Sequence, residues 1–394
     1  MFKLISFLLI ENIILLTSLS LESHQDLIDI DYSVMEAKIN ILASFGKPSQ
    51  QVLIPVDLMN HFTWISDKLF NARQSDTSTY IDEDTLSIKG IIVSAILLKD
   101  RFQLKNKYTI PQLYFFYIKT KSVLNSPGSI GLAFFTSSSN LNVIQQLYQE
   151  QLISYKQFAF VPTNLKVGKV LFGNVTSHIS FNQNRYYSEC KVDMQVRQWG
   201  CNLNFIKIND EIVYDNVTYV QFASEYEGMF ISEEFYKIIK EKIFNNYLDR
   251  NKCKEIKDNT NMKIRCNCGD IKNFPKITFH LGSGYFVFDW KKLFIEISDD
   301  FCYFIMMLHN SEVKKHSIEW VFGHDFLLNY ITVFDYEKQE TRFYSNEDLT
   351  LNKNSIRINL YMERKLQIIK MNISIMIIYL IIILLYKYSL FKKT

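Results

Sequence analysis

The feature that most constrains the fold of this chain is an apolar segment that stops at one carboxylate and then resumes. Residues 50–56 are rich in aliphatic and β-branched side chains, Asp57 follows them, and a second apolar run leads through Trp64 to Ser66. Short runs of such residues predict strands, and the break between them predicts a turn. The sequence therefore predicts a strand, a sharp turn that carries Asp57, and a second strand.

A second pattern is one in which an apolar residue directly precedes a glycine. It appears as Ile130-Gly131-Leu132 and as Phe322-Gly323, and the second copy precedes an aromatic and β-branched run that ends at Asp335. A Gly-Lys-Pro-Ser-Gln stretch at residues 46–50 precedes the Asp57 strand, and residues 169–173 are a further strand candidate. The order of these motifs limits the folds that the chain can adopt.

In this order the motifs resemble the pepsin family of aspartic proteases, over about residues 35 to 345. The resemblance implies a mainly β fold with two antiparallel lobes, 35–195 and 196–345, and helices near residues 143–147 and 235–239. It also implies that a peptide or protein ligand binds in the cleft between the lobes and that no cofactor is needed.

Length and composition agree with this interpretation. The chain has 394 residues, enough for two domains, and 48% of them are apolar, enough for a large core. Its 44 basic and 41 acidic residues nearly balance. We therefore expect no nucleic-acid partner, and we expect the lobes to act as a monomer.

The chemistry of the resembled family needs one aspartate from each lobe, because the two carboxyl groups share a proton and hold the attacking water. Asp57 matches the first aspartate, but Ala223 stands where the second is expected. Met59 and Asn60 replace the small residues that follow the first aspartate, and a β-carbon at residue 59 hinders close approach of the loop. The resemblance therefore predicts a catalytically inactive member that binds a peptide or protein.

The alternative is a working aspartic endopeptidase in which Glu225 or Glu227 supplies the second carboxylate. Loss of one member of a concerted catalytic unit costs ~10⁴ to 10⁶ in kcat. A substitute must also recover a geometry that tolerates errors of only ~0.5 Å. We therefore expect both glutamates to be solvated turn residues.

The family covers bound peptide with a hairpin called the flap, which should follow residues 75–80. Residues 81–91 offer no glycine-rich tip and little length. We therefore expect a full flap to be absent.

Both ends of the chain carry membrane-directed signals. Residues 1–20 read as a signal peptide, and residues 366–386 reach the ~20 residues that a spanning helix needs. We expect a stalk at 346–365 and a basic cytosolic tail at 387–394. These segments predict a single-pass protein of the secretory pathway, with its lobes in the lumen of an endolysosomal compartment or outside the cell.

All six cysteines lie between Cys190 and Cys302, and an even number in a secreted chain predicts disulfides whose pairing the sequence leaves open. The resemblance implies Cys268–Cys302, and of the three ways in which the other four cysteines can pair we expect Cys190 with Cys201 and Cys253 with Cys266. A Cys-x-Cys spacing is shorter than zinc sites use, so we expect no metal.

Two sequons predict glycosylation sites. They begin at Asn174 and Asn216, each in an expected surface turn.

Overall fold

The computed structural model describes residues 27–345, apart from residues 37, 89, 106, 120–125, 135–140, 179–185, 258–260, 299 and 310–319. The described residues belong to one compact unit, Met1–Asn346. The predicted signal peptide (1–20), stalk (346–365), transmembrane segment (366–386) and cytosolic tail (387–394) lie outside the described residues. Within the described part of the chain, no helix is long and apolar enough to cross a membrane.

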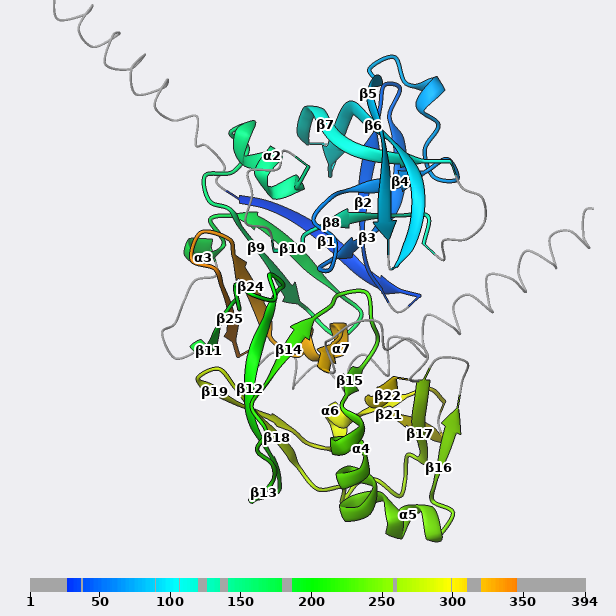
Figure 1. Ribbon diagram of the computed structural model, residues 1–394, viewed down its shortest axis with the longest axis vertical. Helices are drawn as coiled ribbons and strands as arrows, with labels where there is room; N and C mark the ends of the chain where they lie inside the picture. The colour runs from blue at the N-terminus through cyan, green and yellow to red at the C-terminus, as the bar shows by residue number, and fades with distance from the viewer. Residues whose placement is uncertain are drawn as a thin grey trace, which may run out of the picture. The chain divides into compact units, whose positions relative to one another are not determined.

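The fold is mainly β, as predicted, and it is built on two large sheets (Figure 1). The first sheet has 13 strands in the order β11-β25-β24-β9-β10-β1-β2-β3-β8-β4-β7-β6-β5. Its strands are β1 (Leu27–Met35), β2 (Lys38–Phe45), β3 (Gln50–Asp57), β4 (Trp64–Ser66), β5 (Thr79–Ile88), β6 (Ile91–Leu104), β7 (Tyr108–Ile118), β8 (Gly128–Gly131), β9 (Gln157–Pro162), β10 (Val167–Gly173), β11 (Tyr186–Lys191), β24 (Ile331–Asp335) and β25 (Glu340–Tyr344).

The second sheet has 12 strands, and ten of them follow the order β19-β18-β12-β14-β23-β15-β22-β17-β21-β20. The remaining two pair at its side, β13 with β12 and β16 with β17. Its strands are β12 (Gly200–Ile208), β13 (Glu211–Tyr214), β14 (Thr218–Phe222), β15 (Met229–Ile231), β16 (Cys253–Lys257), β17 (Asn261–Asn267), β18 (Ile277–Leu281), β19 (Gly284–Phe288), β20 (Phe294–Glu296), β21 (Phe301–Phe304), β22 (Met306–His309) and β23 (Trp320–Phe322).

Short helices connect the strands, and the two predicted helices are confirmed as α2 and α4. Each begins at a side chain that accepts a backbone N–H, Asn142 for α2 (2.8 Å) and Ser232 for α4 (3.2 Å). The helices are α2 (Val143–Gln149), α3 (Val175–His178), α4 (Glu233–Ile239), α5 (Asn245–Asp249), α6 (Trp290–Leu293) and α7 (His324–Leu327), with a 3-10 turn at Ala72–Gln74 and a π-helical turn at Lys240–Phe244.

The end of the described chain completes the first sheet. Strand β24 pairs with β9 (Figure 1). This pairing places Phe334 opposite Phe158, and their rings stack 4.6 Å apart. Trp199 packs against both rings, and its indole N–H donates to the carbonyl of Leu132 at 2.7 Å. Strands β24 and β25 thus lie in the first sheet, although their residues belong to the range 196–345 that is expected for the second lobe.

The three predicted disulfides are confirmed. They join Cys190 to Cys201, Cys253 to Cys266, and Cys268 to Cys302. Cys253 and Cys266 lie opposite each other on the β16–β17 hairpin, and Cys302 lies on the neighbouring strand β21. Among the described residues no group of three or more His, Cys, Asp or Glu side chains could hold a metal ion.

Residues 81–91, where we expect a full flap to be absent, form part of a two-stranded hairpin. Strands β5 and β6 pair from Thr79 opposite Lys99 to Ile88 opposite Ile91, and Gly90 in the turn has a φ of +78°. Glycine adopts a positive φ at no steric cost. The hairpin therefore forms without a glycine-rich tip.

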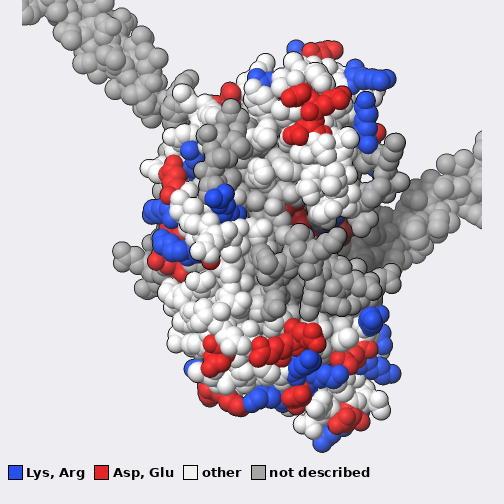
Figure 2. Space-filling view, in the orientation of Figure 1, with Lys and Arg blue, Asp and Glu red and all other residues white. Residues whose placement is uncertain are grey.

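Charged side chains of both signs are interspersed over the face of the molecule in Figure 2. This distribution agrees with the near balance of acidic and basic residues in the sequence.

Candidate active site

Asp57 ends strand β3 and lies against strand β8. The two strands are parallel, with Asp57 opposite Gly131, and the N–H of Leu132 donates to the carbonyl of Asp57 at 2.7 Å. A Cβ at Gly131 would lie 2.3 Å from the carbonyl oxygen of Phe62 and 2.7 Å from that of Asn60. Only glycine therefore lets the loop after Asp57 pass this close to β8.

The carboxylate of Asp57 is 2% exposed and accepts hydrogen bonds at both oxygens. Oδ1 accepts from the backbone N–H of Met59 at 2.7 Å and from that of Asn60 at 3.2 Å. Oδ2 accepts from the Asn60 side-chain amide and from the hydroxyl of Ser129 at 3.4 Å. Four donors match the roughly four acceptor sites of a carboxylate, so neighbouring groups fill the hydrogen-bonding capacity of Asp57.

Ala223 occupies the counterpart of Asp57 in the second sheet. It follows β14, which runs parallel to β23 as β3 runs parallel to β8, and β23 also leads to a glycine, Gly323. A Cβ at Gly323 would lie 2.1 Å from the carbonyl oxygen of Tyr226 and 2.5 Å from that of Gly228. Tyr226 and Gly228 lie three and five residues after Ala223, just as Asn60 and Phe62 lie three and five residues after Asp57. Ala223 is fully buried.

Ser224 connects the two loops. Its hydroxyl donates to the carbonyl of Val56 at 2.7 Å and accepts from the N–H of Leu58 at 3.2 Å. Both partners are neighbours of Asp57 in the sequence, and Ser224 is fully buried. Leu58 has an apolar side chain and cannot form a hydrogen bond with the loop after Ala223. Of these two residues, Ser224 therefore supplies the linking side chain.

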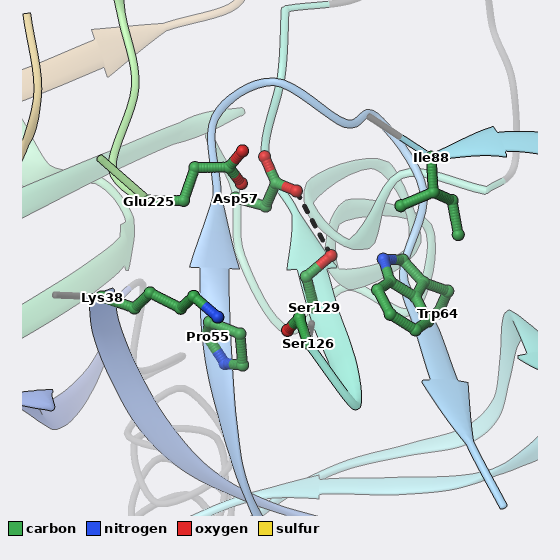
Figure 3. A pocket seen from close by; sticks show the side chains of 8 residues that line it. All are labelled: Lys38, Pro55, Asp57, Trp64, Ile88, Ser126, Ser129 and Glu225. Carbon is green, nitrogen blue, oxygen red and sulfur yellow. Dashed lines mark hydrogen bonds between the residues drawn. The ribbon is translucent and has the colours of Figure 1, made fainter. Parts of the chain in front are cut away.

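The two alternative glutamates lie in different environments. Glu227 is exposed, as expected, whereas Glu225 is only 8% exposed, so the expectation that it is solvated is wrong. The turn after Ala223 directs Glu225 inward, and Figure 3 shows its carboxyl group pointing toward that of Asp57. Glu225 and Asp57 thus belong to one pocket.

The pocket is small, with an internal volume of about 10 Å³. This is the space that one water molecule needs. Its walls come from β2, β3, β4, β5, β8 and the segment that leads into it, and the loop after β14 (Figure 3). The lining residues are Lys38, Pro55, Asp57, Trp64, Ile88, Ser126, Ser129 and Glu225.

Three lining residues had no distinguishing signal in the sequence. Trp64 is 2% exposed, and its indole nitrogen has no hydrogen-bond partner among the described residues. Ser129 reaches Asp57 from β8, and Ile88 comes from the β5–β6 hairpin. Trp64 and Ile88 belong to one apolar cluster under that hairpin, so the hairpin closes one side of the pocket.

The model of the eukaryotic aspartyl protease family matches residues 57–345 of this chain, which is most of its length. The chain belongs to this family. A comparison with curated proteins finds no match. The matched region begins at Asp57 and includes Ala223. That Asp57 retains a catalytic role and that Ala223 marks a lost one stay predictions.

The two sequons also stay predictions. Asn216 is exposed in the loop between β13 and β14, and Asn174 is partly exposed at the start of α3. His61, the histidine nearest to Asp57 in the sequence, is exposed and packs its ring 5.2 Å from that of Phe62.

Proposed function

We propose that this member of the aspartyl protease family is catalytically inactive and that it binds a peptide or protein in its interlobe cleft. The observation that carries the proposal is Ala223, which is buried at the counterpart of Asp57. A methyl group neither takes up nor releases a proton, so the pair of aspartates that the family's chemistry needs is missing.

The hydrogen bonds of Asp57 support the same proposal. Both carboxylate oxygens already accept from Met59, Asn60 and Ser129. A general base must direct a free acceptor position at the proton that it removes. With its acceptor positions taken, Asp57 suits a role in holding the loop.

The hairpin over the pocket supports ligand binding. Its inward residues Leu86 and Ile88 pack with Trp64 and Phe116 in one apolar cluster. A hairpin that packs on the cleft through apolar contacts can lift and close again over an extended ligand.

The proposed setting is a membrane-anchored protein of the secretory pathway. The family and the three disulfides are typical of an oxidising, extracytosolic compartment. The apolar residues 366–386 supply the proposed anchor, and the lobes would then lie in the lumen or outside the cell.

The test is incubation of the purified full-length chain with a diverse peptide pool from about pH 3 to 7, beside an Asp57→Ala variant. We expect peptides to be retained by the protein and no cleavage above that of the variant. Cleavage that disappears in Asp57→Ala would refute the inactive assignment.

A second candidate function is an aspartic endopeptidase that uses Asp57 with Glu225. The burial of Glu225 in the Asp57 pocket favours it. In that case Glu225→Gln should abolish cleavage, whereas Glu227→Gln, which changes an exposed neighbour, should leave it intact.

A further inference from the structure

We infer that the outer face of strands β16, β17 and β21 in the second sheet binds a sulfated polysaccharide chain. The three strands lie side by side (Figure 1). None of their residues lines the Asp57 pocket. The inference is therefore independent of whether the chain binds or cleaves a peptide.

These strands have one buried side and one side toward solvent. Cys253 of β16, Cys266 of β17 and Cys302 of β21 lie opposite one another in a row, and all three are buried. Successive side chains of a strand point to opposite faces of the sheet. The outward-facing residues, which we call the basic face, are exposed or half-buried: Lys254, Ile256, Lys263, Arg265, Phe301 and Tyr303.

Charge is sorted between the two sides of these strands. Three of their four basic residues face outward, namely Lys254, Lys263 and Arg265. Their single acidic residue, Glu255, lies opposite Ile264, which is fully buried, and so points inward. The basic face thus receives three positive charges and no negative one from its own strands.

Two of these cations are placed where they repel each other. Lys254 and Arg265 lie directly opposite each other on β16 and β17. Like charges at directly opposite positions of neighbouring strands destabilise a sheet. Glu255 does not compensate them, because its carboxylate pairs with Lys240 at 2.8 Å on the inner side. An anion bound between Lys254 and Arg265 would remove the repulsion, so the face favours an anionic partner.

Aromatic rings accompany the cations. The Arg265 guanidinium lies 4.7 Å from the ring centroid of Phe301, and the Lys263 ammonium lies 5.9 Å from that of Tyr303. Phe301 is 39% exposed, and Ile297, whose N–H donates to the carbonyl of Phe301, is 53% exposed. The partner therefore meets apolar surface beside the positive charges.

The spacing of the cations indicates a chain of anions. Lys263 lies two residues from Arg265 on β17, roughly 7 Å along the strand. One small anion cannot span that distance, whereas a polymer with regularly placed sulfates can. Its sulfates would accept charge-assisted hydrogen bonds from the cations, and the C–H faces of its sugar rings would pack on the exposed aromatic rings.

The test is the affinity of the full-length chain, held in a neutral detergent, for heparin and for uncharged dextran. We expect heparin to bind and dextran not to bind. Each cation that displaces a counterion adds roughly one to the slope of log Kd against log salt, so the parent should give a slope of about 3. Lys254→Gln combined with Arg265→Gln should lower the slope by about 2 and weaken binding by about tenfold or more.

The matched control is Lys166→Gln combined with Lys338→Gln, which removes the same charge from exposed turns of the first sheet. It should leave Kd and the slope unchanged. Equal weakening by the two double variants, or no binding of heparin by the parent, would overturn the inference. Because Lys254→Gln with Arg265→Gln removes a repulsion, it should not lower the melting temperature, which separates a loss of binding from a loss of folding.

A further variant separates a polysaccharide from other anionic partners. Phe301→Ala should weaken heparin binding several-fold with an unchanged salt slope, and it should leave the weaker binding of polyglutamate unaffected. Polyglutamate or phosphatidylserine micelles that bind more tightly than heparin would point to an acidic protein or a lipid surface. Either result would overturn the assignment of the partner.

Discussion

Replacement of Arg342 by methionine should strongly destabilise the first sheet. Arg342 lies on β25 and is 7% exposed. Its Nη2 is 3.1 Å from Oδ2 of Asp335, and its Nε is 3.2 Å from Oε1 of Glu340, an ion pair rather than a well-directed hydrogen bond. Both carboxylates are buried, and Lys191 also pairs with Glu340. The cluster therefore balances two negative charges with two positive ones.

Arg342→Met removes one positive charge and leaves a buried carboxylate unbalanced, which typically costs 3–5 kcal/mol. Asp335 keeps the Gln157 amide at 2.7 Å and two backbone N–H donors. We therefore expect the lower end, ~3 kcal/mol in the free energy of unfolding at pH 7. Urea unfolding followed by tryptophan fluorescence measures this loss.

The matched control is Arg250→Met, because Arg250 is exposed. Its effect should stay within about 0.5 kcal/mol. A loss below about 1 kcal/mol for Arg342→Met would refute the reasoning, because it would mean that the charges are compensated without the guanidinium.

Three further changes test the site and the second sheet. Gly131→Ala would press a methyl group onto the carbonyl of Phe62 and should cost about 1–3 kcal/mol in urea unfolding; an unchanged midpoint would contradict the crowding. Ser224→Ala leaves two buried backbone groups beside Asp57 unsatisfied, so the free energy of unfolding should fall by about 1–3 kcal/mol. An unchanged free energy of unfolding would mean that the link is dispensable. Burial lowers the pKa of His280, so as the pH falls the unfolded chain takes up a proton at this residue before the folded chain does. Stability therefore falls as the pH drops below about 6.5. In His280→Gln the decrease in melting temperature between pH 7 and 5 should be smaller.

The positions of Asp57 and Ala223 could be predicted because short local patterns define them. Each follows an apolar strand, and each strand has a partner that leads to a glycine. The inward direction of Glu225 could not be predicted, because it depends on the backbone of a turn without a repeating pattern. Two residues later the same turn exposes Glu227. An identical side chain thus has opposite environments within one loop.

Neither the pairing of β5 with β6 nor the place of β24 in the first sheet could be predicted from the sequence, for different physical reasons. The turn between β5 and β6 carries a single glycine, Gly90, and no glycine-rich motif marks it in the sequence. Strand β24 carries the expected apolar pattern, but that pattern does not identify its partner strand. The stacking of Phe334 on Phe158 fixes the pairing only in three dimensions.

The pairing of β24 with β9 has a consequence for synthesis of the protein. Gln157 on β9 and Asp335 on β24 are hydrogen-bonded partners 178 positions apart in the sequence. At ~5–20 residues per second the ribosome needs roughly 10 to 40 seconds to make the intervening chain. During that time one edge of β9 has no partner strand, and an open edge is a template for pairing with other chains. The open edge of β9 is therefore exposed to mispairing until residue 335 has been synthesised.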